Sequence, residues 1–402
     1  MLVAGEASGD ALGAGLVRAL RRRLGDGAGF VGVGGPKMAD AGIVSPFDIA
    51  ELSIVGLAEI LWAAPRLLRR VREVVRLALE ERPDIVVLID SWGFTIRVAE
   101  ALRRATPVLP LVKYVGPQVW AMRPGRARSL ARTVDRLLTI HSFDAPLFEA
   151  QGLATTFVGN PVLSWDTSGA DPSRLRRAIG ARRGDGVLLI LPGSRPREIE
   201  RMLGPFEAAT SILKAERPKL RLVMAAADTV AAQVKARVAG WRHAVHVVEG
   251  EADKLDAMSA ATAALACSGT VTTELAMAGC PMVISYRLDH LTHFVARFLI
   301  RTPYIALINI AAGSSVAPEL VQQQCTGVQL AAALAPLLDD PVRRAAQIAA
   351  QGLAVAKLGR GGPDPSERAA DAVLEVLEAS RAKRAGARAP RREPGRPQLD
   401  PR

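Results

Sequence analysis

The sequence has few aromatic residues and few cysteines. Phe, Trp and Tyr make up 4% of the 402 residues, although 49% of the residues are hydrophobic. Ala, Val and Leu must therefore do most of the packing, which suits a layered α/β architecture better than an aromatic-rich β-sandwich. The three cysteines, Cys267, Cys280 and Cys325, lie far apart and lack the spacing of metal ligands. They predict buried thiols in a reduced, cytoplasmic protein.

Long apolar runs are missing as well. No uncharged apolar stretch reaches about 18 residues, so the sequence predicts no membrane-spanning segment. The chain opens directly on the short apolar stretch 1–5, so we also expect no secretory signal. Its length is sufficient for two domains of ordinary size, each with its own core.

Positive charge exceeds negative charge, but unevenly. The formal net charge is +12, and residues 381–402 carry eight basic and two acidic side chains. Half of the excess therefore lies in one basic C-terminal tail, which we expect to be disordered and solvated. No stripe of Lys and Arg is interleaved with stacking aromatic residues, which argues against nucleic-acid binding.

Strands alternate with helices along the whole chain. In the first half, the expected strands are residues 1–4, 30–35, 85–90, 108–114 and 136–140. In the second half, they are residues 187–191, 220–226, 246–248, 263–266 and 282–285. This alternation implies right-handed crossovers and parallel sheets. We therefore predict an α/β fold of two Rossmann-like, doubly wound domains that face a cleft, where a ligand is expected.

The break between the two series defines the expected domains. Residues 160–186 are rich in Pro, Gly, Ser and Asp, which indicates an interdomain connection. We place an N-terminal domain at residues 1–163 and a C-terminal domain at residues 164–345. Helices in residues 346–380 are expected to pack back on the N-terminal domain, and the tail occupies 381–402.

The turn after the strand at 187–191 has the features of an anion site. Gly193, Ser194 and Arg195 follow the strand, and a helix opens through Glu198. Unpaired N–H groups at a helix start carry a partial positive charge, and an arginine adds a bidentate donor. Since many strand-to-helix turns contain Gly and Ser for geometry alone, a purely structural turn is the alternative.

Two further groups follow strands of the first half. Ser8 and Asp10 lie in the small-residue run 5–10, where they can hold sugar or phosphate groups or simply cap a helix. Asp90 ends the buried strand 85–90, an environment that tunes a general base. A structural carboxylate is the alternative for Asp90.

Polar residues also follow later strands of both series. Gln118 and Arg123 can bind a polar head group, and Trp120 between them can stack on a sugar or fill the interdomain floor. The run Ser268, Gly269, Thr270 and Glu274 repeats the opening pattern: its hydroxyls suit a diphosphate at a helix start, and its carboxylate suits a ribose. Capping of that helix is the alternative.

Three polar residues near the end stand in apolar surroundings. Asn309, Glu319 and Gln322 are candidate site groups on this basis, although a loop or a helix cap would have the same pattern.

The expected helix 57–75 combines an apolar face with an arginine-rich face. Such a helix can lie on an anionic membrane surface, or it can be an ordinary amphipathic core helix. The candidate membrane contacts are Leu57, Ile60, Leu61, Trp62, Leu67 and Leu68.

Taken together, the motifs resemble those of the lipid-A-disaccharide synthases, glycosyltransferases of the two-Rossmann-domain GT-B type. The resemblance runs from the opening to about residue 375 and rests on several motifs in family order. These are residues 4–10, 34–38, 118–121, 191–195, 268–270 with Glu274, and 318–320 with Gln322.

The resemblance implies an inverting transfer that uses no metal or other cofactor. UDP-2,3-diacylglucosamine would give its sugar to the 6-hydroxyl of 2,3-diacylglucosamine 1-phosphate, forming a β-1′,6-linked disaccharide 1-phosphate and UDP. The family's candidate base falls on Asp90, its UDP-binding groups fall on Arg195 and Glu274, and Asn309 and Gln322 match cleft positions. The acylated substrates imply contact with the cytoplasmic surface of the inner membrane. A homodimer is an alternative to a monomer.

One departure from the family pattern keeps other functions open. After Asp90 the family usually continues with a small residue, Pro, an acidic residue and Phe, whereas this chain has Ser91, Trp92, Gly93 and Phe94. A weakened or silent nucleotide- or lipid-binding homologue is therefore one alternative. A transferase for another UDP-amino sugar, or an epimerase, is another.

Overall fold

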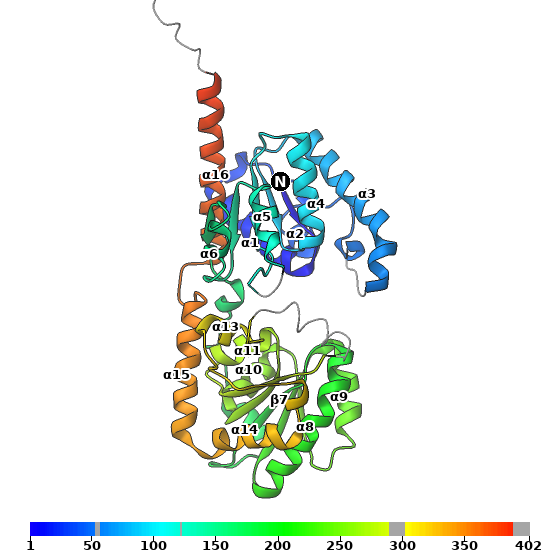
Figure 1. Cartoon of the computed structure of the whole chain (residues 1–402). Helices are drawn as coiled ribbons and strands as arrows, with labels where there is room; N and C mark the ends of the chain where they lie inside the picture. The colour runs from blue at the N-terminus through cyan, green and yellow to red at the C-terminus, as the bar shows by residue number, and fades with distance from the viewer. Residues whose placement is uncertain (53–56, 121–122, 289–301, 389–402) are drawn as a thin grey trace, which may run out of the picture.

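The computed structural model describes residues 1–52, 57–120, 123–288 and 302–388. Within these ranges it contains two six-stranded sheets, and all the strand pairs are parallel. Each sheet forms the centre of a separate lobe with helices on both faces (Figure 1). The predicted fold class, two Rossmann-like parallel-sheet domains, is confirmed.

The N-terminal sheet has the strand order β2-β1-β3-β4-β5-β6. Its strands are β1 (Leu2–Ala4), β2 (Gly32–Val33), β3 (Val86–Ile89), β4 (Leu111–Tyr114), β5 (Arg136–Thr139) and β6 (Thr155–Phe157). The helices of this part of the chain are α1 (Ala7–Leu24), α2 (Pro36–Asp40), α3 (Leu57–Glu81), α4 (Trp92–Ala105), α5 (Gly125–Ala131) and α6 (Ala145–Glu149).

The C-terminal sheet has the order β12-β11-β10-β7-β8-β9. Its strands are β7 (Val187–Leu191), β8 (Arg221–Ala226), β9 (His246–Glu249), β10 (Ala263–Cys267), β11 (Met282–Tyr286) and β12 (Glu319–Val321). The helices after β6 are α7 (Pro172–Ala178), α8 (Pro196–Glu216), α9 (Ala231–Val238), α10 (Glu251–Ala260), α11 (Thr270–Met277), α13 (Leu307–Ala312), α14 (Gly327–Asp339), α15 (Pro341–Lys357) and α16 (Pro365–Arg388).

The central strands are apolar throughout because helices cover both faces of each sheet. In β7 every residue is buried. Leu188 and Ile190 join the core on one face, and Leu189 and Leu191 join the core on the other. Successive side chains of a strand point to opposite faces, so an unbroken apolar run is what a doubly covered parallel strand requires.

The last helices divide between the two domains. Ala354 and Val355 of α15 belong to the core of the C-terminal domain, whereas Ala369 and Val373 of α16 belong to that of the N-terminal domain. Figure 1 shows α15 beside the lower lobe and α16 beside the upper lobe. The expectation that all of residues 346–380 pack on the N-terminal domain was therefore wrong for α15, whose apolar face matches the C-terminal core.

Helix α16 also corrects the start of the expected tail. It continues to Arg388, so residues 381–388 are helical, not disordered as predicted. Arg381 lies 3.4 Å from the Asp84 carboxylate, and Arg384 donates to the carbonyl of Val108. These contacts extend the docking of α16 along the N-terminal domain. Residues 389–402 lie outside the described residues.

Helix α3 contains Pro65 and lies on the sheet face opposite α1 and α16 (Figure 1). Leu67 packs against the core of that face, whereas Leu68 is 46% exposed. The side chains of the other proposed membrane contacts, Leu57, Ile60, Leu61 and Trp62, lie outside the described residues. No helix in the described ranges combines the length and hydropathy that a bilayer crossing needs.

Candidate functional site

A cavity of about 590 Å³ lies at the carboxyl edge of the C-terminal sheet, the edge where ligands bind in open α/β folds. It is lined by the ends of β7, β8 and β10 and by the starts of α10 and α11. Five of the residues predicted to bind substrate line it: Arg195, Ser268, Gly269, Thr270 and Glu274. The tertiary structure thus brings together two motifs that are more than seventy residues apart in the chain.

The turn after β7 is organised around Glu198. Its Oε2 accepts the N–H groups of Ser194 and Arg195 at 3.0 and 3.3 Å, and its Oε1 lies 3.2 Å from Arg195 Nη1. Gly193 has φ +113°, and a Cβ there would lie 2.5 Å from Glu198 Oε2, so the turn requires glycine. Glu198 therefore occupies donors that we expected an anion to use, and an incoming phosphate would have to replace it.

Arg195 itself remains accessible at this turn. Its side chain is 77% exposed, so the guanidinium can turn toward a ligand in the cavity. On the buried side, the Tyr286 hydroxyl donates to Glu198 Oε1 at 3.2 Å. Burial and the nearby Glu198 carboxylate raise the pKa of Tyr286 to about 12, so this hydroxyl stays protonated and fixes Glu198.

Lys254 is a cavity residue that sequence reasoning missed. Its Nζ lies 3.0 Å from Glu274 Oε2 and 2.9 Å from Glu251 Oε1, and also 5.8 Å from the ring centre of Trp165. Burial lowers the pKa of Lys254, but the two carboxylates outweigh it and the pKa is raised, so the ammonium stays charged. On the polar helix α10 this lysine had no distinguishing pattern in the sequence.

Asp90 follows β3 at the carboxyl edge of the N-terminal sheet. Its side chain is half-buried, and its Oδ2 accepts the Ser8 hydroxyl at 2.7 Å. Gly9 makes room for this pairing, because a Cβ there would lie 3.2 Å from the Ile89 carbonyl. The two predicted groups Ser8 and Asp90 are thus neighbours although 82 positions separate them.

Asp10 was expected to bind substrate, and the structure gives it a different task. It is 2% exposed, and its carboxylate accepts the N–H groups of Gly35, Lys37 and Met38 at 2.7 to 2.9 Å. These donors belong to the start of α2, where a carboxylate is favoured. Asp10 therefore fixes α2 against α1. This is the capping role that the sequence left open, but Asp10 caps α2 and not its own helix α1.

Asn309 and Glu319 are also held inside the fold. Asn309 is fully buried, and its amide bonds the backbone of Val316 and Ala317. Glu319 accepts the Asn309 amide and the N–H groups of Ile305 and Ala306 at the start of α13. Their polar atoms thus hold the segment between α13 and β12, and their role in binding substrate stays a prediction.

Gln322 has a similar position beyond β12. Its Oε1 accepts the Leu288 N–H at 2.8 Å, and it does not line the cavity. This bond ties the end of β12 to the end of β11. The structure therefore gives Gln322 a structural contact, and its role in binding substrate stays a prediction.

The loop after β4 carries Gln118 and Arg123, both exposed. Between them, Trp120 packs edge-on against Phe143 at 5.5 Å, and Phe143 in turn packs against the core of the C-terminal domain. Trp120 therefore lies at the junction of the domains. This agrees with the alternative that its side chain fills the space between the two domains. The exposure of Gln118 and Arg123 allows both side chains to meet a ligand.

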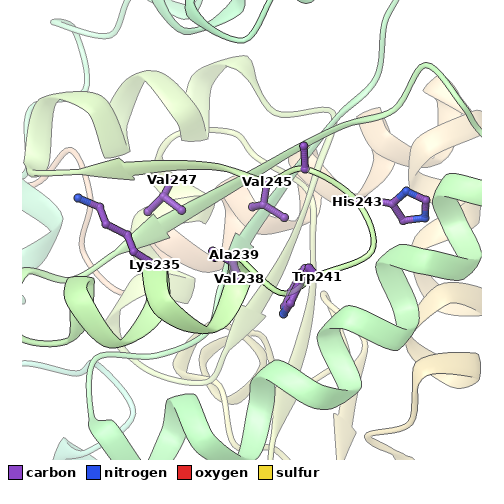
Figure 2. Close-up of a pocket in the computed structure, with 8 residues that line it drawn as sticks. Lys235, Val238, Ala239, Trp241, His243, Val245 and Val247 are labelled. Carbon is purple, nitrogen blue, oxygen red and sulfur yellow. The ribbon is translucent and has the colours of Figure 1, made fainter.

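A second hollow of about 290 Å³ lies between α9 and β9. Figure 2 shows Lys235 and His243 at opposite ends of it, with Val238, Trp241 and Val245 between them. Its polar groups do not converge on one point, so it lacks the character of a catalytic site. Within the described ranges, no three His, Cys, Asp or Glu residues gather as metal ligands.

Comparison with known proteins supports the resemblance seen in the motifs. A sequence model of the Lipid-A-disaccharide synthetase family matches residues 1–372. The Lipid-A-disaccharide synthase of Rhodospirillum centenum is 44% identical over 376 residues, covering 94% of each chain. That of Paramagnetospirillum magneticum is 42% identical over 387 residues, covering 96% of this chain and 99% of the relative.

Solved structures support the fold. A S. aureus MnaA-UDP co-structure gives a TM-score of 0.61 at 14% identity and covers 94% of this chain and 96% of its own. The glycotransferase of kitacinnamycin gives a TM-score of 0.58 at 16% identity, and the match covers 94% of this chain and 98% of that structure. Both likenesses extend over the two domains and confirm the GT-B type arrangement. On the family match and the identity to curated relatives, the chain belongs to the lipid-A-disaccharide synthase family of glycosyltransferases.

Proposed function

We propose that this chain condenses UDP-2,3-diacylglucosamine with 2,3-diacylglucosamine 1-phosphate and releases UDP. The C-terminal cavity would hold the UDP-sugar donor, and the N-terminal domain would present the acceptor. The observation that carries this proposal is the Asp90 carboxylate at the carboxyl edge of one sheet, combined with a cation-containing cavity at the same edge of the other.

The donor half would bind UDP through charge and helix starts. The exposed Arg195 guanidinium and the Lys254 ammonium are the cations at the cavity. The start of α11 at Thr270 adds backbone N–H groups that lack partners within the helix. Glu274, which also lines the cavity, would accept from a ribose hydroxyl pair. A departing diphosphate would gain most from these donors as its negative charge develops.

Asp90 would act as the general base for the acceptor. Within the described part of the chain only its Oδ2 has a hydrogen-bond donor, Ser8, which leaves Oδ1 for the acceptor hydroxyl. The carboxylate would take the proton of the 6-hydroxyl while that oxygen bonds to the anomeric carbon of the donor. The bond from that carbon to the diphosphate breaks from the opposite face, which inverts the configuration and releases UDP.

The test is turnover of both lipid precursors by the purified chain and by Asp90→Asn. We expect the variant to lose at least a hundredfold in kcat, within the range that general base catalysis contributes, while UDP affinity stays unchanged. Asp84→Asn, an exposed carboxylate of the same domain, is the matched control and should keep full activity. UDP binding without turnover by the wild type would favour the silent homologue instead. Turnover only with a different UDP-amino sugar would favour the other alternative.

We also infer that the chain acts as a peripheral protein on the cytoplasmic surface of the inner membrane. Both substrates carry acyl chains, and the start of α3 combines Leu57, Ile60, Leu61 and Trp62 in sequence. Leu68, on the same helix, is 46% exposed, and the neighbouring Arg69 side chain is 60% exposed. An exposed apolar group beside a cation suits an anionic lipid surface. Leu67 is not part of this proposal because it packs inward.

The membrane proposal is tested by partitioning on vesicles that contain anionic lipid. Leu61→Ser combined with Trp62→Ser should move the protein from the vesicle fraction to the supernatant. Leu353→Ser, which changes a 70% exposed leucine on the C-terminal domain, is the control and should leave partitioning unchanged. Equal partitioning of the double variant and the wild type would refute the proposal.

A further inference from the structure

Lys113 is a buried cation that the mechanism above does not use. It lies on β4, where a core strand would ordinarily carry an apolar residue, and it is 2% exposed. Its Nζ donates to the backbone carbonyl of Asp90 and, at 2.7 Å, to the hydroxyl of Thr95. The side chain therefore ends directly behind the residue proposed as the base.

The backbone that Lys113 contacts is in a strained conformation. Asp90 has φ +50° and Ser91 has φ +40°, two consecutive left-handed residues that are not glycine. Such a conformation is unfavourable for a residue with a Cβ and persists only where its surroundings hold it. Thr95 Oγ1 lies 2.7 Å from the Asp90 carbonyl and 3.0 Å from the Ser91 carbonyl. Lys113 and Thr95 are thus the side chains that hold this turn from inside the domain.

Stability alone does not explain a lysine at this position. Burial lowers the pKa of Lys113 to about 7, although the Asp90 and Glu6 carboxylates oppose the shift. An apolar side chain would avoid this cost. The benefit that fits the contacts is control of the turn, since the direction of the Asp90 carboxylate follows from the backbone at Asp90 and Ser91.

We propose that Lys113 is a positioning residue for the transfer: by holding the Asp90 carbonyl and the Thr95 hydroxyl, it keeps the left-handed turn that aims the Asp90 carboxylate at the acceptor. This inference rests on the proposed role of Asp90 as the base. It assigns to Lys113 no contact with substrate.

The first test is Lys113→Met, which keeps an unbranched side chain of similar length but removes the donor and the charge. We expect kcat to fall on the order of a hundredfold, as a misplacement of about 1 Å can cause. KM for the UDP-sugar and the affinity for UDP should stay unchanged, because the donor cavity lies in the other domain. A kcat equal to that of the wild type would overturn the inference.

A second pair of variants does not depend on the folding of Lys113→Met. Thr95→Val removes the hydroxyl but keeps the shape, and Thr95→Ser keeps the hydroxyl. We expect the valine variant to lose kcat and the serine variant to retain most of it. Equal kcat in the two variants would contradict the role of the Lys113–Thr95 contact.

The double variant Asp90→Asn/Lys113→Met separates this inference from the proposed function. If Lys113 acts through Asp90, the second substitution should change the residual rate of Asp90→Asn by less than twofold. If Lys113→Met lowers kcat by the same factor in the Asp90→Asn background as in the wild-type background, Lys113 acts independently of Asp90 and the inference is overturned. If Asp90→Asn keeps full activity, the proposed base is wrong. If it is inactive while Lys113→Met is fully active, only the inference fails.

Discussion

The burial of Lys113 predicts how the stability of the N-terminal domain depends on pH. An ammonium that is exposed in the unfolded chain has its ordinary pKa, 10.5, whereas burial in the fold lowers the pKa of Lys113 to about 7. Below pH 7 Lys113 is protonated in both the folded and the unfolded state, and the buried cation lowers the free energy of unfolding by its full amount. Between about pH 7 and 10.5 the unfolded state binds more protons than the folded state, so stability rises with pH. Lys113→Met removes this dependence.

The size of the effect follows from the width of that window. Each unit of pKa difference corresponds to about 1.4 kcal/mol. Between pH 7 and pH 9, the free energy of unfolding of the wild type should therefore gain about 2 kcal/mol relative to Lys113→Met. The variant should be the more stable protein at pH 7, and its advantage should shrink toward pH 10.

The assay is urea unfolding of both proteins at several pH values between 6.5 and 10. All groups other than Lys113 titrate in both proteins, so their contributions cancel in the difference between the two free energies. Tryptophan fluorescence and far-UV circular dichroism together check that the same transition is followed. A difference that stays constant within about 0.5 kcal/mol over this range would refute the burial of a titrating Lys113.

Three further variants test the structural roles of Asp10 and Asn309 and the proposed binding role of Lys254. Asp10→Ala should lower the free energy of unfolding by about 2 to 4 kcal/mol, because three N–H groups at the start of α2 lose a charged acceptor. Urea titration measures this change, and a loss below about 0.5 kcal/mol would contradict the capping role. Asn309→Ala should lower the melting temperature, yet leave UDP affinity unchanged below the transition; weaker UDP binding by the folded variant would restore its expected ligand role. Lys254→Met should weaken UDP binding about tenfold, or about 1.4 kcal/mol, as measured by calorimetry. Lys235→Met, which changes a lysine outside the cavity, should leave the affinity for UDP unchanged. Equal UDP affinities of Lys254→Met and the wild type would exclude Lys254 from the donor site.

Much of the fold could be predicted because the strand pattern is strong. Central strands such as β7 and β10 are short, continuous apolar runs, the pattern of a doubly covered parallel strand. Strands β6 and β12, each three residues long and only half-buried, escaped prediction because they lie at sheet edges where little apolar patterning is needed. The part of α15 after residue 345 was assigned to the wrong domain, since an apolar face does not specify which core it covers.

The site divides along similar lines. Arg195 and Glu274 were predicted together because each follows a core strand, and parallel strands bring their carboxyl ends to one edge. Asn309 and Glu319 were predicted on a different basis, their apolar surroundings, and their amide and carboxylate bond the backbone of their own segment. Polar residues in apolar surroundings have the same pattern whether they bind a ligand or hold a loop, and only their hydrogen-bond partners distinguish the two.

The sequence by itself therefore determined the family, the two parallel-sheet domains and the motif positions at the strand ends, because these depend on local pattern and chain order. The tertiary structure alone decided which polar groups are free. It directs Asp10 into the start of α2, places Glu198 over the Arg195 turn, pairs Lys254 with Glu274, and buries Lys113 behind Asp90. Each of these outcomes depends on side chains from distant segments, whose distances the order of residues along the chain does not contain.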